Sequence, residues 1–185
     1  MVRDYRWSTP RGTYSFPAEI SSADFAAAHA LIDAPAEIKL REAVRYCCAR
    51  GWPEHFRNLS AGTGESLPEI VVGFAQSFSY HHEGLQPRLP AETLQSRWAN
   101  CADRSILAAS LLQSLGFSGA AYVEVAWPYH ALLGLDSPEA QGDAIFIHGR
   151  RFVLWELTSP GARLGTNFFA NIIAARVVFP AEEED

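Results

Sequence analysis

The most apolar helical pattern in the chain runs from Cys101 to Leu115. Apolar residues recur there at helical spacing over a wide arc, and the polar stripe between them is narrow, with Asp103, Ser110 and Ser114. This pattern is typical of a helix with only one narrow face that suits water. We therefore expect the rest of the protein to enclose most of this helix.

The residues around Cys101 indicate where this helix begins. Asn100 is a favourable N-cap, and Asp103 at the third helical position can complete a capping box. Cys101 would then be the first helical residue, where unpaired backbone N–H groups and the positive end of the helix dipole favour a thiolate. An isolated cysteine is more often a buried structural residue, so its predicted neighbours decide between the two interpretations.

Three segments after this helix have the alternation or the apolar runs of β-strands: 121–127, 130–134 and 145–156, the last as a hairpin that turns at 149–150. His130 begins the second segment and Glu156 ends the third. Burying Glu156 without a partner would be costly, and a histidine N–H is a natural partner. A carboxylate on one ring nitrogen fixes the tautomer and leaves the other nitrogen free to take a proton from a thiol.

Five stretches together resemble the bacterial and archaeal transglutaminase-like superfamily: Phe74–Tyr80, Pro90–Leu94, Trp98–Gly116, His130–Ala131 and Phe152–Thr158. The resemblance implies a papain-like fold in which a helix carries the nucleophile and an antiparallel sheet supplies the other two residues. By position, Cys101 would be the nucleophile, His130 the general base and acid, and Glu156 the orienting carboxylate. Many relatives have Asp where this chain has Glu156, and Gly-Asp where it has Ala99-Asn100.

We therefore expect an α+β fold of the transglutaminase-like or papain-like kind, with a central cysteine-bearing helix on an antiparallel β-sheet and additional N-terminal helices. The composition, 48% hydrophobic and 19% charged over 185 residues, favours a single ordered domain spanning 1–185. Within it, 1–65 would be an N-terminal strand and helical cover, 66–165 the catalytic core, and 166–185 a last strand and an acidic tail. We expect a strand at 12–20, helices near 23–34, at 36–50 and from 66 onwards, and a last strand at 174–179.

Further residues are candidates for supporting roles. The side-chain N–H of Gln76 could stabilise an oxyanion, although the backbone N–H of Cys101 is the stronger candidate. Trp98 would either wall the cleft or cap the core. His148, at the predicted hairpin tip, is the alternative base to His130.

The charge, the hydropathy and the cysteine positions argue against several classes of binding partner, compartment and cofactor. The net charge of −6, with no Lys/Arg-rich run, argues against nucleic-acid binding. No apolar run is long enough for a membrane span. The cysteines also suggest no disulfide framework, because Cys47 and Cys48 are adjacent and Cys101 is far from both. We therefore expect a cytoplasmic protein. We expect no metal or cofactor, because no Cys-x-x-Cys spacing is present and the 62–64 loop lacks a phosphate-binding pattern.

The sequence thus predicts cysteine-dependent acyl transfer or hydrolysis on a peptide or an amide-bearing small molecule, through an acyl-thioester on Cys101. Protease, amidase, deamidase and amide-forming transferase chemistry all fit one triad, and neither the acceptor nor the oligomeric state follows from the residues. Two other classes stay open: a catalytically inactive binding module with the same fold, and a coenzyme A-dependent acyltransferase.

Overall fold

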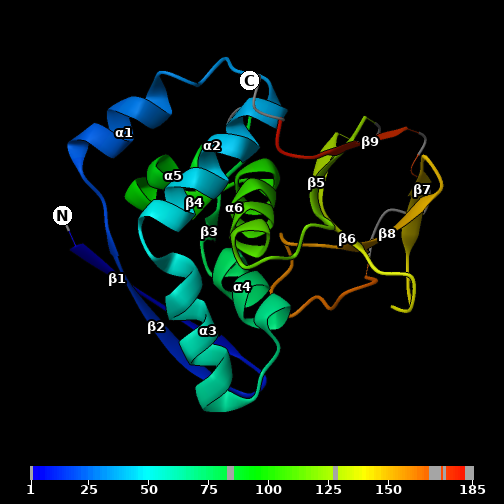
Figure 1. Ribbon diagram of the computed structural model, residues 1–185, viewed down its shortest axis with the longest axis horizontal. Helices are drawn as coiled ribbons and strands as arrows, with labels where there is room; N and C mark the ends of the chain where they lie inside the picture. The colour runs from blue at the N-terminus through cyan, green and yellow to red at the C-terminus, as the bar shows by residue number, and fades with distance from the viewer. Residues whose placement is uncertain (1, 83–85, 127–128, 167–171, 173, 182–185) are drawn as a thin grey trace.

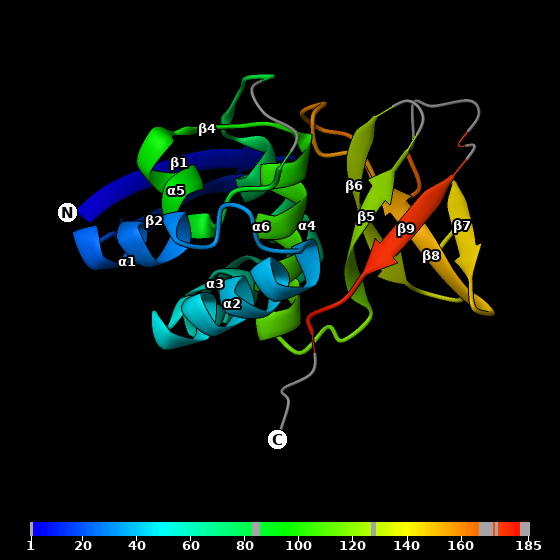
Figure 2. The ribbon, with the colours of Figure 1, turned by 90° about the horizontal axis from the view of Figure 1, so that it is seen from above.

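The computed structural model describes residues 2–82, 86–126, 129–166, 172 and 174–181. An N-terminal hairpin and a group of helices form one side of the molecule, and a curled five-stranded sheet forms the other (Figures 1 and 2). The described helices are α1 Ser22–His29, α2 Ala36–Ala49, α3 Trp52–Thr63, α4 Leu67–Gln76, α5 Pro90–Ser96 and α6 Cys101–Ser114. The α+β class is confirmed.

The hairpin at the N-terminus pairs β1 Val2–Thr9 with β2 Gly12–Glu19 in antiparallel register. Alternation buries one face of the hairpin against α3 and α4, with Tyr5, Trp7, Tyr14 and Phe16 pointing inward. The strand expected at 12–20 is confirmed. β1 was not predicted, although Tyr5 and Trp7 alternate with polar residues in the way that a half-buried strand requires.

Four of the described helices match predicted ones, namely α1, α2, α4 and α6, although α1 ends at His29 rather than near residue 34. Two more, α3 and α5, were not predicted. The segment at 51–53 was interpreted only as the end of α2. In the structure Gly51 adopts φ +67° and α3 begins at once, with Pro53 in the first turn, where a proline loses no hydrogen bond. Trp52 and Phe56 bury the inner face of α3. In the chain, α5 follows the short strand β3, Ser79–Tyr80, and precedes the short strand β4, Trp98–Ala99, which leads into α6.

The main sheet has the strand order β7-β8-β6-β5-β9, with antiparallel neighbours throughout. Its strands are β5 Ala120–Val125, β6 His130–Asp136, β7 Ala144–Ile147, β8 Arg150–Trp155 and β9 Ala175–Val178. The β7–β8 hairpin turns at His148 and Gly149, one residue earlier than predicted. Both residues have positive φ, which gives the strands the twist of a type I′ connection. Residue 127, expected to end a strand, lies outside the described residues.

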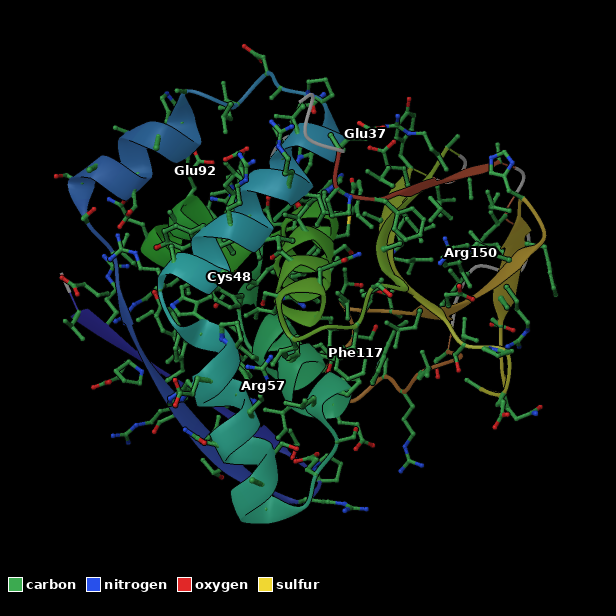
Figure 3. The ribbon with its side chains drawn as sticks, viewed as in Figure 1. Glu37, Cys48, Arg57, Glu92, Phe117 and Arg150 are labelled. Carbon is green, nitrogen blue, oxygen red and sulfur yellow. The ribbon has the colours of Figure 1, made fainter. Side chains whose placement is uncertain are left out.

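α6 lies between the helices and the sheet, in contact with α2 and α4 on one side and with β5 and β6 on the other (Figure 1). Even the stripe residues Asp103 and Ser110 are fully buried, so the expected enclosure of this helix is confirmed. A second link runs at the surface: Glu37 of α2 accepts a 2.8 Å bond from Arg176 of β9, and Figure 3 shows Glu37 where α2 approaches that strand. No helix in the described part of the chain is long and apolar enough to cross a membrane.

Candidate active site

The first turn of α6 has the predicted capping box. The Asn100 side chain accepts from the Asp103 N–H at 2.9 Å, and the Asp103 carboxylate accepts from the Asn100 N–H at 3.0 Å. Because these bonds satisfy donors at the start of the helix, they fix Cys101 as its first residue. Cys101 is partly exposed, whereas its neighbours on both sides are buried.

Asp103 has a second partner, which the sequence did not indicate. Its carboxylate accepts from the Arg88 backbone N–H at 2.7 Å and from the Arg88 guanidinium at 2.7 and 3.0 Å. The guanidinium also stacks on the Trp98 ring, 3.6 Å from its centroid, and donates to the Trp98 carbonyl. These contacts hold the chain before α5 against the first turn of α6.

The sheet brings His130 and Glu156 together. Leu133 of β6 faces Trp155 of β8, so His130, three residues earlier, comes level with the chain just beyond β8. His130 Nε2 lies 2.8 Å from Glu156 Oε2. The other carboxylate oxygen accepts from the N–H and the hydroxyl of Thr158, each at 2.6 Å. Glu156 is only 1% exposed, so its charge is stabilised by these partners rather than by water.

The pKa values of the two groups move in opposite directions. Burial lowers the pKa of His130, but hydrogen bonds with the side chains of Cys101 and Glu156, and their negative charge, outweigh it and raise the pKa to about 9. Burial raises the pKa of Glu156, but the hydrogen bonds from His130 and Thr158 outweigh it and hold the pKa below its usual value. The pair is therefore an imidazolium and a carboxylate at neutral pH.

Cys101 is the third member of this group. Its side chain is near enough to His130 for hydrogen bonding to contribute to the raised pKa of the imidazole. Because Glu156 occupies Nε2, Nδ1 is the ring nitrogen left for the sulfur. The structure thus brings together a sulfur at the start of a helix, an imidazolium and a buried carboxylate. This arrangement can activate a thiol and return a proton to a leaving group.

Gln76 has a place other than the expected one. Its side-chain amide donates to the carbonyls of Glu156 at 3.1 Å and Ala162 at 3.4 Å, and its oxygen accepts from the Gly161 N–H at 3.1 Å. Both amide hydrogens are therefore used, and no donor is left for an oxyanion. The oxyanion role is corrected to a positioning one: Gln76 ties α4 to the segment that carries Glu156.

The remaining candidates from the sequence are Trp98 and His148. Trp98 lies between Arg88 and His81, with a centroid distance of 5.4 Å to the His81 ring. His148 is exposed at the tip of the β7–β8 hairpin, whereas His130 is the histidine paired with Glu156. The geometry therefore favours His130 over His148 as the base.

Two residues beside the site were missed. Arg104, 2% exposed, donates to the Leu157 carbonyl at 2.7 Å and to the Phe78 carbonyl, and its guanidinium lies 5.5 Å from the Tyr80 ring centroid. Burial, and next the negative charge of Cys101, raise the pKa of Tyr80. A signal for Arg104 was present, because its helical neighbours four and seven residues on are Ala108 and Leu111. A charge on such an apolar face needs buried partners.

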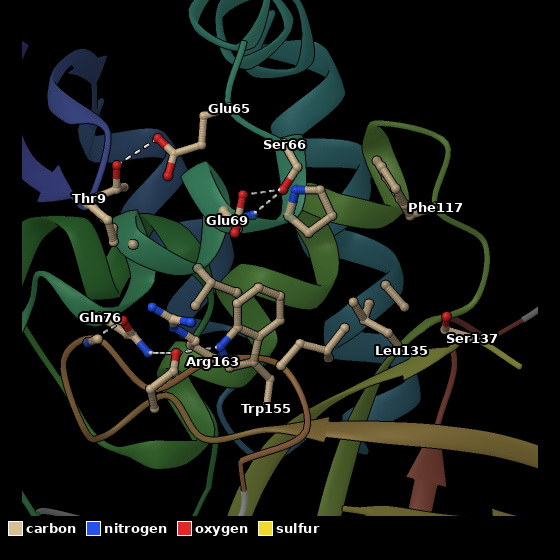
Figure 4. A pocket seen from close by; sticks show the side chains of 18 of the residues that line it. Thr9, Glu65, Ser66, Glu69, Gln76, Phe117, Leu135, Ser137, Trp155 and Arg163 are labelled. Carbon is tan, nitrogen blue, oxygen red and sulfur yellow. Dashed lines mark hydrogen bonds between the residues drawn. The ribbon is translucent and has the colours of Figure 1, made fainter. Parts of the chain in front are cut away.

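A cavity of about 880 Å³ opens elsewhere, between the tip of the N-terminal hairpin, α4, the end of α6 and the sheet (Figure 4). Its walls include Gln76, Phe117, Leu135, Trp155 and Arg163, but neither Cys101 nor His130. α6 is about 20 Å long at 1.5 Å per residue, and the cavity meets its far end. The nucleophilic and titratable side chains converge at Cys101, not at this cavity.

Within the described residues, no cluster of three or more histidine, cysteine, aspartate or glutamate side chains could hold a metal ion. Comparison of the chain with protein-family models, with curated proteins and with solved structures finds no match.

Proposed function

We propose that the protein is a cysteine-dependent hydrolase or acyltransferase that acts on an amide or peptide bond. The observation that carries this proposal is the buried His130–Glu156 pair, whose imidazolium also hydrogen-bonds to the side chain of Cys101. A charged pair of this kind is costly to bury, and a purely structural role would not require a nucleophilic sulfur beside it. The resemblance to the transglutaminase-like superfamily assigns the same three residues.

In this proposal the Cys101 sulfur attacks the carbonyl carbon of the substrate, and a C–S bond forms as the carbonyl becomes an oxyanion. His130 then gives its proton to the leaving amine, the C–N bond breaks, and an acyl-thioester remains on Cys101. Neutral His130 next takes a proton from water or from an acceptor amine. That nucleophile attacks the thioester and releases the sulfur as a thiolate.

Glu156 has the orienting role. Its bond to Nε2 keeps Nδ1 directed to the sulfur, and its charge balances the imidazolium. Thr158 and Gln76 act through it, Thr158 on the carboxylate and Gln76 on the Glu156 carbonyl. A glutamate is longer than an aspartate, and these extra contacts hold the longer side chain in one position.

The proposed substrate is a peptide or an amide-bearing small molecule. The three free cysteines suit a reducing compartment, so we infer a cytoplasmic setting for the reaction. Hydrolysis and transfer to an amine use the same thioester and differ only in which nucleophile reaches it.

The test is acylation of Cys101 by p-nitrophenyl acetate at neutral pH, quenched in acid and mapped by peptide mass spectrometry. We expect acetyl-Cys101 to form in the wild type and in Cys48→Ser, and to be lost in His130→Ala. Absence of acetyl-Cys101 in the wild type would overturn the proposal in favour of an inactive module. A parallel reaction with acetyl-coenzyme A distinguishes the remaining class, because rapid acetylation from that donor would indicate a coenzyme A-dependent acyltransferase.

A further inference from the structure

The proposed reaction creates an oxyanion that the site has to stabilise. Preorganised hydrogen-bond donors supply this stabilisation in acyl-transfer enzymes. The backbone N–H of Cys101, at the start of α6, is one available donor. Gln76 is not a second one, because its amide is bonded to the carbonyls of Glu156 and Ala162. A second donor would have to come from another group beside Cys101.

Tyr80 is placed to do so. It belongs to β3, a two-residue strand of Ser79–Tyr80 that pairs in parallel with β4, Trp98–Ala99, and Tyr80 faces Ala99. Side chains alternate along a strand, and Asn100 is still extended, so the side shared by Tyr80 and Ala99 is also the side of Cys101. Trp98 and His81, whose ring centroids lie 5.4 Å apart, belong to the opposite side.

Arg104 brings the Tyr80 ring to the first turn of α6. Its guanidinium lies 5.5 Å from the ring centroid, within the range of a cation–π contact. Arg104 is itself fixed by the carbonyls of Phe78 and Leu157, and it is one helical turn from Cys101. Its Nε–H has no hydrogen-bond partner among the described residues, so part of this buried cation remains unpaired beside the site.

The Tyr80 hydroxyl is available as a donor. The residue is 44% exposed, and no hydrogen bond holds its hydroxyl within the described part of the chain. Burial and the negative charges of Cys101 and Glu156 raise the pKa of Tyr80 more than Arg104 lowers it, so the hydroxyl keeps its proton at neutral pH. It is a neutral, protonated donor with one side open to a ligand.

We propose that the Tyr80 hydroxyl donates a hydrogen bond to the carbonyl oxygen of the acyl group on Cys101, and that Arg104 holds the Tyr80 ring in place for this contact. The inference rests on the proposed function. It assigns Tyr80 as a catalytic residue and Arg104 as a positioning residue, and it explains how the site works although Gln76 is not free.

The test compares two reactions of the same sulfur in Tyr80→Phe. Acetylation by p-nitrophenyl acetate passes through an oxyanion, whereas alkylation by iodoacetamide displaces iodide from a saturated carbon and does not. We expect acetylation of Cys101 to slow by roughly 100-fold while alkylation stays within about twofold of wild type. Tyr46→Phe is the matched control, because it removes a hydroxyl from α2 that has no hydrogen-bond partner among the described residues, and it should change neither rate.

The outcomes separate the two proposals. If wild-type Cys101 is acetylated and Tyr80→Phe is acetylated as fast, the Tyr80 assignment is wrong and the proposed function stands. If Tyr80→Phe slows both reactions equally, Tyr80 acts on the thiol rather than on the oxyanion, and the assignment is again wrong. If wild-type Cys101 is not acetylated at all, the proposed function fails and the assignment fails with it.

Discussion

The two ends of α6 are built on different principles. At the first turn, Asn100, Asp103 and Arg104 are buried and hydrogen-bonded to each other, to Arg88, or to backbone carbonyls of distant segments. From Ile106 to Leu112, the helix is held mainly by apolar packing against α2, α4 and the sheet. Directional bonds fix a geometry, whereas burial supplies most of the stability.

This difference predicts how substitutions divide. A change in the apolar half should lower the free energy of unfolding, and reactivity should suffer only through loss of fold. Cys101→Ser should alter reactivity and leave most of the stability intact, whereas a change in the charged His130–Glu156 pair should alter reactivity together with the pH dependence of stability.

The largest effect is expected for Cys101→Ser. A hydroxyl is a poorer nucleophile than a thiolate, so acylation by p-nitrophenyl acetate should fall to the level of the uncatalysed background. The change keeps a small polar group at the first helical position, so the free energy of unfolding in urea should change by less than about 1.5 kcal/mol. A larger loss of unfolding free energy would show that Cys101 is a core residue, and the two ends of α6 would then not differ in role.

Glu156→Gln should have the next largest effect. The amide cannot balance the charge of the imidazolium and can favour the wrong tautomer of His130. We therefore expect turnover of p-nitrophenyl acetate to fall by roughly 100-fold or more, with the fold retained. The matched control is Glu124→Gln, which removes a carboxylate from an exposed ion pair with Arg176 on the same sheet. If both variants stay within a fewfold of wild-type turnover, the Glu156 carboxylate has only a structural role.

Leu112→Ala tests the other half of α6. Leu112 is fully buried, and truncation leaves a cavity, so the free energy of unfolding should fall by roughly 2–5 kcal/mol. The folded fraction should still alkylate at Cys101 at the wild-type rate. A variant that is as stable as wild type but unreactive would reverse the assignment of the two ends.

The pH dependence of stability should report the His130–Glu156 pair. His130 has a folded pKa of about 9, above its ordinary value of 6.5, so its contribution is complete below pH 6.5 and is lost as the pH rises to about 9. Glu156 has a lowered pKa, so its contribution is present above pH 4.5 and is lost on further acidification. The stability difference between wild type and His130→Gln should therefore shrink by roughly 2–3 kcal/mol from pH 6.5 to 9. A difference that does not change with pH in urea unfolding would show that His130 is not charged in the fold.

The first turn of α6 also shows which features of the site could be predicted from the sequence. The cap at Asn100 and Asp103 was predictable because its residues are close in sequence and follow a known hydrogen-bond pattern. The His130–Glu156 contact was predicted from the cost of burying a carboxylate, with the strand order as support. The α+β class and the antiparallel strands followed from periodicity.

What the sequence did not show depends on long-range contacts. Gln76 reaches the carbonyl of Glu156, 80 positions away in the chain, and local periodicity contains no information about that partner. Arg104 was missed for the same reason, since its partners belong to the chain after α4 and after β8. α3 was missed because Gly51 and Pro53 suit the end of one helix and the beginning of the next equally well.

The most direct test of the central claim, that Cys101 is the reactive nucleophile, is competitive alkylation by a limiting amount of iodoacetamide at pH 7, mapped by mass spectrometry. Cys47 is fully buried, and burial raises its pKa, so it should react least, whereas exposed Cys48 serves as the internal reference. We expect Cys101 to be alkylated at least tenfold faster than Cys48, although it is less exposed, and this advantage to shrink in Glu156→Gln. Alkylation of Cys48 ahead of Cys101 in the folded wild-type protein would contradict the account.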